Sequence, residues 1–172
     1  MNKALLVGNR VVVVDQPLAS SIYNKGLFGV FDEGKLYLSL EEALYLKEKK
    51  NLEIFNSSGK RMTNKMILNE FEKKEKGFTK RFIVFKLMRD EGYILKSALK
   101  YGGDFRVYNK GEKPGKEHAE WILKVYDQGE TIKFKDFSAL NRVVHSVKKK
   151  LLIAVVDDEN SATFYEVDWK GI

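Results

Sequence analysis

Leu151-Leu-Ile-Ala-Val-Val156 is the longest unbroken apolar run in the chain. Because it lacks polar alternation, it predicts a central strand that is covered on both faces. An amphipathic helix is expected before it, from Phe137 or Ser138 to Lys150, and a last strand after it, from Thr163 to Trp169. This order of elements favours a mixed α/β fold in which helices flank a sheet.

The residues that precede this passage supply the rest of the same sheet. Thr79–Glu91 has the apolar spacing of a helix, and Gly92 follows it at a position where helix ends favour glycine. Three further strands are expected at Tyr93–Lys96, Phe105–Tyr108 and Trp121–Val125. We therefore place a C-terminal α/β domain at residues 77–172.

Residues 1–76 have the pattern of a separate α+β domain. Its clearest signal is Ser39 followed by Glu42, which is the spacing of a capping box at the start of a helix. The other expected elements are three short strands and a mostly polar helix, at Val11–Val14, Lys35–Leu38, Leu52–Phe55 and residues 63–76. The 172 residues are thus expected to form two domains.

The charge balance favours a polyanionic partner. Lys and Arg outnumber Asp and Glu by 31 to 24, which gives a formal net charge of +7. Such a surface suits nucleic acid or an anionic membrane, although an ordinary basic protein has the same composition.

Two absences in the sequence narrow the class of protein. There are no cysteines, which excludes disulfides, thiolate nucleophiles and cysteine zinc sites. No apolar run approaches the roughly 20 residues that span a bilayer, and Met1–Arg10 lacks a cleavage-site pattern. We expect a cytoplasmic protein without a membrane partner.

Histidine is the residue type suited to acid–base chemistry at neutral pH, and the sequence contains two, His118 and His145. His118 follows the charged turn Lys113–Glu117 and opens a strand, so it is either a candidate acid or an ordinary surface residue. His145 lies beside Val144 in the expected helix, and we interpret it as a packed or hydrogen-bonded structural residue rather than a catalytic one.

The same helix gathers positive charge. Arg142, His145 and Lys149 are spaced to share one helix face. Lysines at a helix C-terminus are also favoured by the helix dipole without any ligand, so this cluster alone does not define a site.

No recognisable metal site is present in the sequence. Asp157-Asp158 is the best carboxylate pair, and Asp104 and Glu120 are available, but their spacing matches no known ligand pattern. Phosphate-binding and nucleotide-binding glycine motifs are also missing. We expect neither a metal nor a cofactor.

Several motifs together resemble the archaeal tRNA-intron endonuclease family. They are Leu38-Ser-Leu-Glu-Glu-Ala-Leu-Tyr-Leu46, Arg89-Asp-Glu-Gly-Tyr93, Leu99-Lys-Tyr-Gly-Gly-Asp-Phe-Arg-Val-Tyr108 followed by His118, and Arg142-Val-Val-His-Ser-Val-Lys-Lys-Lys-Leu-Leu-Ile-Ala154. They occur in order over nearly the whole chain. The resemblance implies a nuclease-type C-terminal domain and cleavage of precursor tRNA at bulge-helix-bulge introns, which leaves 2′,3′-cyclic phosphate and 5′-hydroxyl ends.

The resemblance also implies roles for five residues. Tyr108, His118 and Lys149 match the residues with which this family cleaves RNA, and no metal takes part. Arg142 and Trp169 match the pair that holds a flipped bulge base between a guanidinium group and an aromatic ring.

One repeat of this length implies assembly. The family's single-repeat members form homotetramers or pair with a separate structural subunit, and the short segment between Tyr108 and His118 favours the homotetramer. The loop from Tyr126 to Phe137, with Asp127, Glu130 and Asp136, resembles the acidic loop through which dimers dock.

Two other functions remain open at this point. One is a non-catalytic structural subunit of the same assembly, against which the presence of Tyr108, His118 and Lys149 together argues. The other is a metal-dependent DNA nuclease with a similar layered architecture.

Overall fold

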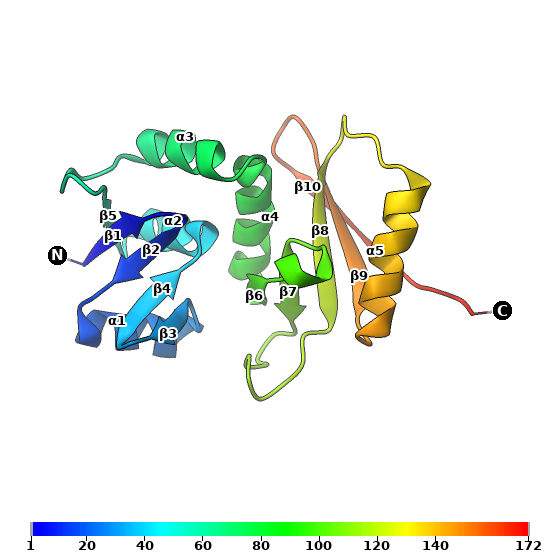
Figure 1. Ribbon diagram of the computed structural model, residues 1–172, viewed down its shortest axis with the longest axis horizontal. Coiled ribbons are helices and arrows are strands. Elements are labelled where there is room, and N and C mark those ends of the chain that lie inside the picture. The colour runs from blue at the N-terminus through cyan, green and yellow to red at the C-terminus, as the bar shows by residue number, and fades with distance from the viewer. Residues whose placement is uncertain (1, 172) are drawn as a thin grey trace. The chain divides into compact units, whose positions relative to one another are not determined.

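The computed structural model describes residues 2–171 and divides into two compact units, Met1–Phe82 and Ile83–Ile172 (Figure 1). An α+β unit comes first, and a mixed α/β unit with a helix-flanked sheet follows. The fold class predicted from the sequence is therefore confirmed. No helix within residues 2–171 is long and apolar enough to cross a membrane.

The N-terminal unit is built on a five-stranded sheet in the order β3-β4-β2-β1-β5. Only the pairing of β1 with β5 is parallel. The elements are β1 Lys3–Val7, β2 Arg10–Val13, α1 Gln16–Gly26, β3 Val30–Asp32, β4 Lys35–Leu38, α2 Leu40–Glu48, β5 Glu53–Phe55 and α3 Asn64–Lys74.

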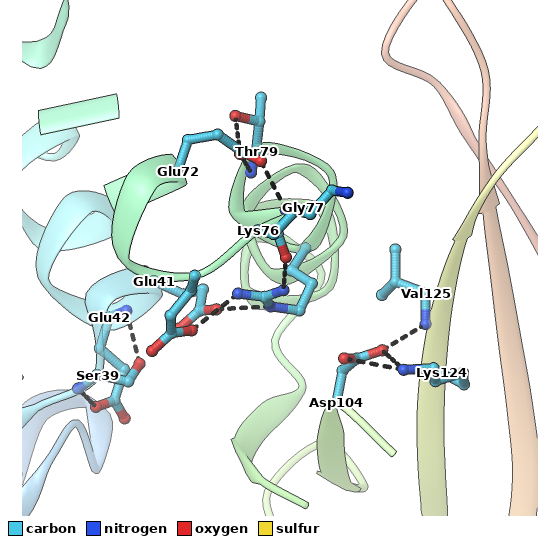
Figure 2. A network of polar contacts seen from close by, with 12 residues as sticks. Ser39, Glu41, Glu42, Glu72, Lys76, Gly77, Thr79, Asp104, Lys124 and Val125 are labelled. Carbon is cyan, nitrogen blue, oxygen red and sulfur yellow. Dashed lines mark hydrogen bonds and ion pairs between the residues drawn. The ribbon is translucent and has the colours of Figure 1, made fainter. Parts of the chain in front are cut away.

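The predicted capping box begins α2. The Glu42 amide donates to Ser39 Oγ at 3.2 Å, and Glu42 Oε2 accepts from the Ser39 amide at 3.0 Å (Figure 2). The other carboxylate oxygen of Glu42 accepts from the Gly29 amide at 3.0 Å, so this buried side chain also ties the segment before β3 to the helix.

A five-stranded sheet in the order β10-β9-β8-β7-β6 forms the C-terminal unit. β8 and β9 are parallel and α5 connects them, whereas the other neighbours are antiparallel. The elements from the connecting helix onward are α4 Phe78–Asp90, β6 Ile94–Ser97, the 3-10 helix η1 Leu99–Tyr101, β7 Phe105–Tyr108, β8 Trp121–Asp127, α5 Phe134–Ser146, β9 Lys150–Val156 and β10 Ala162–Val167.

Helices cover both faces of this second sheet. On one face, Val144 of α5 packs in a buried cluster with Ile122, Leu151 and Ile153. On the other face, Phe85 of α4 lies against Phe105 of β7, with the ring centroids 5.7 Å apart. The apolar run at Leu151–Val156 is thus an internal strand, as predicted, although β8 is the middle strand of the sheet.

The turn at Gly102 and Gly103 sets the start of β7. Gly102 has a φ of 76°, and a Cβ on Gly103 would lie 2.4 Å from Ile122 Cγ2. Glycine is therefore required at both positions. The next residue, Asp104, accepts from the Val125 amide at 2.8 Å and contacts Lys124 Nζ at 3.4 Å, which ties this turn to β8 (Figure 2).

Three N-terminal elements were not expected from the sequence, namely β1, α1 and β3. A signal for α1 is present: Asp15 caps the helix through a 2.9 Å bond from the Leu18 amide, and Pro17 stands in the first turn. β1 and β3 are short, and their outward residues include exposed apolar side chains, which blurs the alternation.

The expected helix from Phe137 or Ser138 to Lys150 was wrong at both ends. α5 begins three or four residues earlier, at Phe134, and ends at Ser146. It stops there because Lys148 adopts a left-handed conformation with φ 56°, after which Lys150 enters β9. Lys149 therefore does not share a helix face with Arg142 and His145. The last strand is also shorter than expected, so Trp169 follows β10 rather than lying on it.

Candidate active site

Strand register brings the three predicted catalytic segments to one edge of the C-terminal sheet. Val107 pairs with Trp121, and Trp121 pairs with Lys150. The end of β7, the start of β8 and the start of β9 consequently lie side by side, at the lower end of this unit in Figure 1. Neighbouring strands are about 4.8 Å apart, so roughly 10 Å separates the backbones of β7 and β9.

Tyr108 is the last residue of β7. Its side chain is 4% exposed, so the ring is buried. No buried side-chain oxygen or nitrogen in the described part of the chain lacks a hydrogen-bond partner, and no bond to the Tyr108 hydroxyl is present. The hydroxyl therefore reaches the surface, and the phenol is fixed at its ring and open at its oxygen.

His118 lies at the junction of a loop and β8, as predicted, and it is exposed. A turn precedes it in which the Lys116 and Glu117 amides both donate to the Lys113 carbonyl, at 3.1 and 3.0 Å. The imidazole is therefore free to meet a ligand from solvent.

The backbone at the end of α5 fixes the position of Lys149. The Lys148 amide donates to the His145 carbonyl at 2.9 Å, and the Lys149 amide donates to the Val144 carbonyl at 3.1 Å. This pair of bonds, with Lys148 in the left-handed region, is a Schellman motif. Lys149 is half-buried, and its ammonium group has no ion-pair partner among residues 2–171.

Arg142 and Trp169, the two residues predicted to bind a base, lie at the same end of the unit, but their side chains form no cation–π contact with each other. Arg142 is exposed on the last part of α5. The Trp169 ring lies against His145, with the centroids 4.0 Å apart and the planes at 69°. His145 is thus packed against the Trp169 ring, which agrees with its interpretation as a packed residue, although its side chain is exposed.

Glu120 lies at the centre of the polar contacts along this edge, and it was not recognised from the sequence as a part of the site. Its carboxylate accepts from the Asn109 side-chain amide and from Lys150 Nζ, the latter at 3.0 Å. The hydrogen bond from Asn109, and after it the bond from Lys150, hold the pKa of Glu120 below its ordinary value. Lys150 Nζ also lies 3.5 Å from Glu166, and these two carboxylates raise the pKa of Lys150.

The carboxylates considered as metal ligands have other roles. Asp157 Oδ1 accepts from the Glu159 and Ser161 amides, each at 2.9 Å, and so closes the turn between β9 and β10. Asp104 supports β8 as described above. Within residues 2–171 there is no group of three or more His, Asp or Glu side chains arranged to hold a metal ion.

The edge thus has a phenol at the end of β7, an imidazole in the loop that leads into β8 and an ammonium group on the residue before β9. Such groups can orient or deprotonate a hydroxyl, protonate a leaving oxygen and stabilise developing negative charge. An arginine and an aromatic ring at the same end add surfaces on which a nucleic acid base can stack.

Comparison with known proteins identifies the family. The tRNA intron endonuclease N-terminal domain matches residues 2–68, and the tRNA intron endonuclease catalytic C-terminal domain matches residues 78–164. A tRNA-splicing endonuclease of Thermococcus kodakarensis is 39% identical over 164 residues, which cover 95% of both chains. Those of Methanothermobacter thermautotrophicus and Nanoarchaeum equitans are 36% and 37% identical, over 95% and 96% of both chains. The chain belongs to the tRNA intron endonuclease family.

Proposed function

We propose that this protein is the catalytic subunit of a tRNA-splicing endonuclease, which cuts precursor tRNA at bulge-helix-bulge intron boundaries in the cytoplasm. The observation that supports the proposal is the strand register, which brings the end of β7, the start of β8 and the start of β9, next to Tyr108, His118 and Lys149, to one sheet edge. The names of relatives that match along almost the whole chain support the substrate class.

The reaction that suits these groups needs no metal. The 2′-oxygen next to the scissile bond attacks phosphorus, the bond from phosphorus to the 5′-oxygen breaks, and a 2′,3′-cyclic phosphate and a 5′-hydroxyl result. Tyr108 takes the proton of the 2′-hydroxyl when it is a phenolate, or only orients that hydroxyl when it is neutral. His118 as imidazolium gives a proton to the departing 5′-oxygen, and Lys149 faces the charged oxygens of the phosphorane.

Arg142 and Trp169 would capture an unpaired base of the bulge. A planar guanidinium group and an indole ring can hold a base between them by stacking and cation–π attraction. The contact between Trp169 and His145 supports this role, because it keeps the indole ring beside the last turn of α5, where Arg142 also lies.

We further propose that the chain works as a homotetramer, since one repeat cannot reach two scissile bonds. A heterotetramer with a separate structural subunit is the alternative. The exposed loop between β8 and α5 carries Glu130 and leads to Asp136, and Asp127 stands at its start. These carboxylates are suited to dock on a basic surface of a neighbouring dimer.

A precursor tRNA with one 2′-deoxy substitution at the cut site tests the reaction. Cleavage of the normal RNA should persist in excess EDTA and leave cyclic phosphate ends, while the deoxy substrate should bind and remain uncut. A strict requirement for Mg²⁺, or cutting of the deoxy RNA, would support a metal-dependent nuclease instead. A purified chain that binds the RNA but never cuts it would favour the structural subunit.

A further inference from the structure

The backbone of Glu120 joins the strands that carry the proposed catalytic groups. Its amide donates to the Val107 carbonyl of β7 at 2.9 Å, and its carbonyl accepts from the Lys150 amide of β9 at 3.0 Å. Val107 also pairs with Trp121, so both the first residue of β8 and the residue before it face Val107, in the manner of a β-bulge. Such a bulge redirects the chain where the His118 loop enters β8.

The Glu120 side chain repeats the same connections. One carboxylate oxygen accepts from Asn109 Nδ2 and the other accepts from Lys150 Nζ. Asn109 directly follows Tyr108, Lys150 directly follows Lys149, and Glu120 itself is two residues after His118. The Glu120 carboxylate therefore contacts the residue that follows Tyr108 and the residue that follows Lys149. His118 belongs to the same segment as Glu120 itself.

Glu120 also distinguishes among the three consecutive lysines. Lys150 Nζ is bound to Glu120 and lies near Glu166, whose carboxylate also accepts from Trp121 Nε1 at 2.7 Å. Lys149 has no ion-pair partner among the described residues. The carboxylates thus hold the positive charge of Lys150 in place and leave the ammonium group of Lys149 for a ligand.

We propose that Glu120 is a positioning residue of the active site, which sets the separation of Tyr108, His118 and Lys149 through Asn109 and Lys150. This inference rests on the proposed function. Exposed ion pairs such as that of Lys150, which is half exposed, contribute little to folding stability. The effect of Glu120 should therefore fall on the rate of the chemical step rather than on stability.

Single-turnover cleavage of precursor tRNA by Glu120→Ala tests the proposal. Since a small misplacement of reacting groups can cost up to about 10²-fold in rate, we expect the cleavage rate at saturating enzyme to fall roughly 10- to 100-fold. Affinity for the uncut 2′-deoxy RNA and the midpoint of urea unfolding should stay near those of the parent chain. Glu120→Gln should recover part of the rate, because an amide oxygen still accepts one of the two bonds.

A matched control is Glu70→Ala. Glu70 also forms a partly exposed ion pair, 3.5 Å from Lys74 Nζ, but both residues belong to α3 and neither is a chain neighbour of Tyr108, His118 or Lys149. Its removal should leave the cleavage rate unchanged. If Glu120→Ala did not fold, Asn109→Ala and Lys150→Met would break the two side-chain contacts separately, and each should slow cleavage without weakening RNA binding.

The outcomes separate this inference from the proposed function. Full cleavage by a folded Glu120→Ala protein, with Tyr108→Phe and His118→Ala inactive, would overturn the positioning role alone. An equal loss of RNA binding and of cleavage would also overturn it, because Glu120 would then act on the substrate complex as a whole. Undiminished cleavage by both Tyr108→Phe and His118→Ala would refute the proposed function itself.

Discussion

The left-handed backbone of Lys148 makes a specific prediction about the lysine run. Lys148 has φ 56° at the position of a Schellman motif where glycine is preferred. Replacing it by glycine removes the steric conflict between Cβ and the backbone. Because the side chain of Lys148 is exposed and has no ion-pair partner among the described residues, little else is lost.

The size of the effect follows from two opposing terms. A non-glycine residue in the left-handed region costs roughly 1–2 kcal/mol, whereas glycine loses about 0.5–1 kcal/mol more conformational entropy on folding. Lys148→Gly should therefore stabilise the fold by about 0.5–1 kcal/mol. For a chain of this size that is a rise of about 1–4 °C in Tm. Lys148→Val should instead destabilise the fold by at least about 1 kcal/mol, because a β-branched residue tolerates this conformation poorly.

Urea unfolding and single-turnover cleavage test both sides of this argument. Lys148→Gly should raise the urea midpoint with an unchanged slope and cut precursor tRNA at the parent rate. Lys149→Ala should keep the parent midpoint and lose about 10²–10³-fold in cleavage rate, as expected for removal of an electrostatic stabiliser. A lower midpoint for Lys148→Gly would refute the strain argument. Loss of cleavage in Lys148→Gly but not in Lys149→Ala would show that the wrong lysine has been assigned.

Other variants test the remaining groups. His118→Ala should lose roughly 10²–10⁴-fold in single-turnover rate, as removal of a general acid does, and a rate within a few-fold of the parent would remove it from the mechanism. Trp169→Ala should weaken RNA binding by about 1–3 kcal/mol in a titration, and Arg142→Lys should fail to restore binding if stacking matters as well as charge. Replacement of Asp127, Glu130 and Asp136 by amides should yield dimers by native mass measurement, and a fully active monomer would contradict the assembly. In the N-terminal unit, Arg61 and Lys47 lower the pKa of Glu53 to about 2; stability from this group is present above pH about 4.5 and is lost as the pH falls towards 2, so Glu53→Gln should flatten that part of a pH–stability profile.

Local patterns in the sequence predicted most of the second unit and the start of α2 in the first unit. β7 begins and ends at the expected residues, and the capping box of Ser39 and Glu42 is present as expected. These elements are set by signals within a few residues of one another, namely apolar alternation and a side chain that bonds a nearby amide. At these two places, contacts with residues distant in sequence do not change the structure that the local pattern predicts.

The end of α5 could not be predicted in the same way. Ser-Val-Lys-Lys-Lys continues a helical pattern in composition, and lysine is a good helix former. The helix ends in the left-handed turn at Lys148, and this turn leads Lys150 into its pairing with Trp121 on β8, a contact between residues distant in sequence. For the same reason, Glu120 gave no signal, since its partners Asn109 and Lys150 become neighbours only when the sheet forms.

The catalytic assignment came from the resemblance, and the fold supplies a physical reason for it. Tyr108 ends β7 and Lys149 directly precedes β9, so the spacing of these two residues depends on backbone hydrogen bonds between strands, whereas His118 lies in the loop that leads into β8. That spacing is nearly independent of the residues elsewhere in each strand. In the proposed site, the strand ends next to Tyr108 and Lys149 are therefore fixed once the sheet has formed. The contacts that hold the strand ends together therefore matter most for this spacing, and the Glu120 carboxylate contacts both Asn109, which follows β7, and Lys150 of β9.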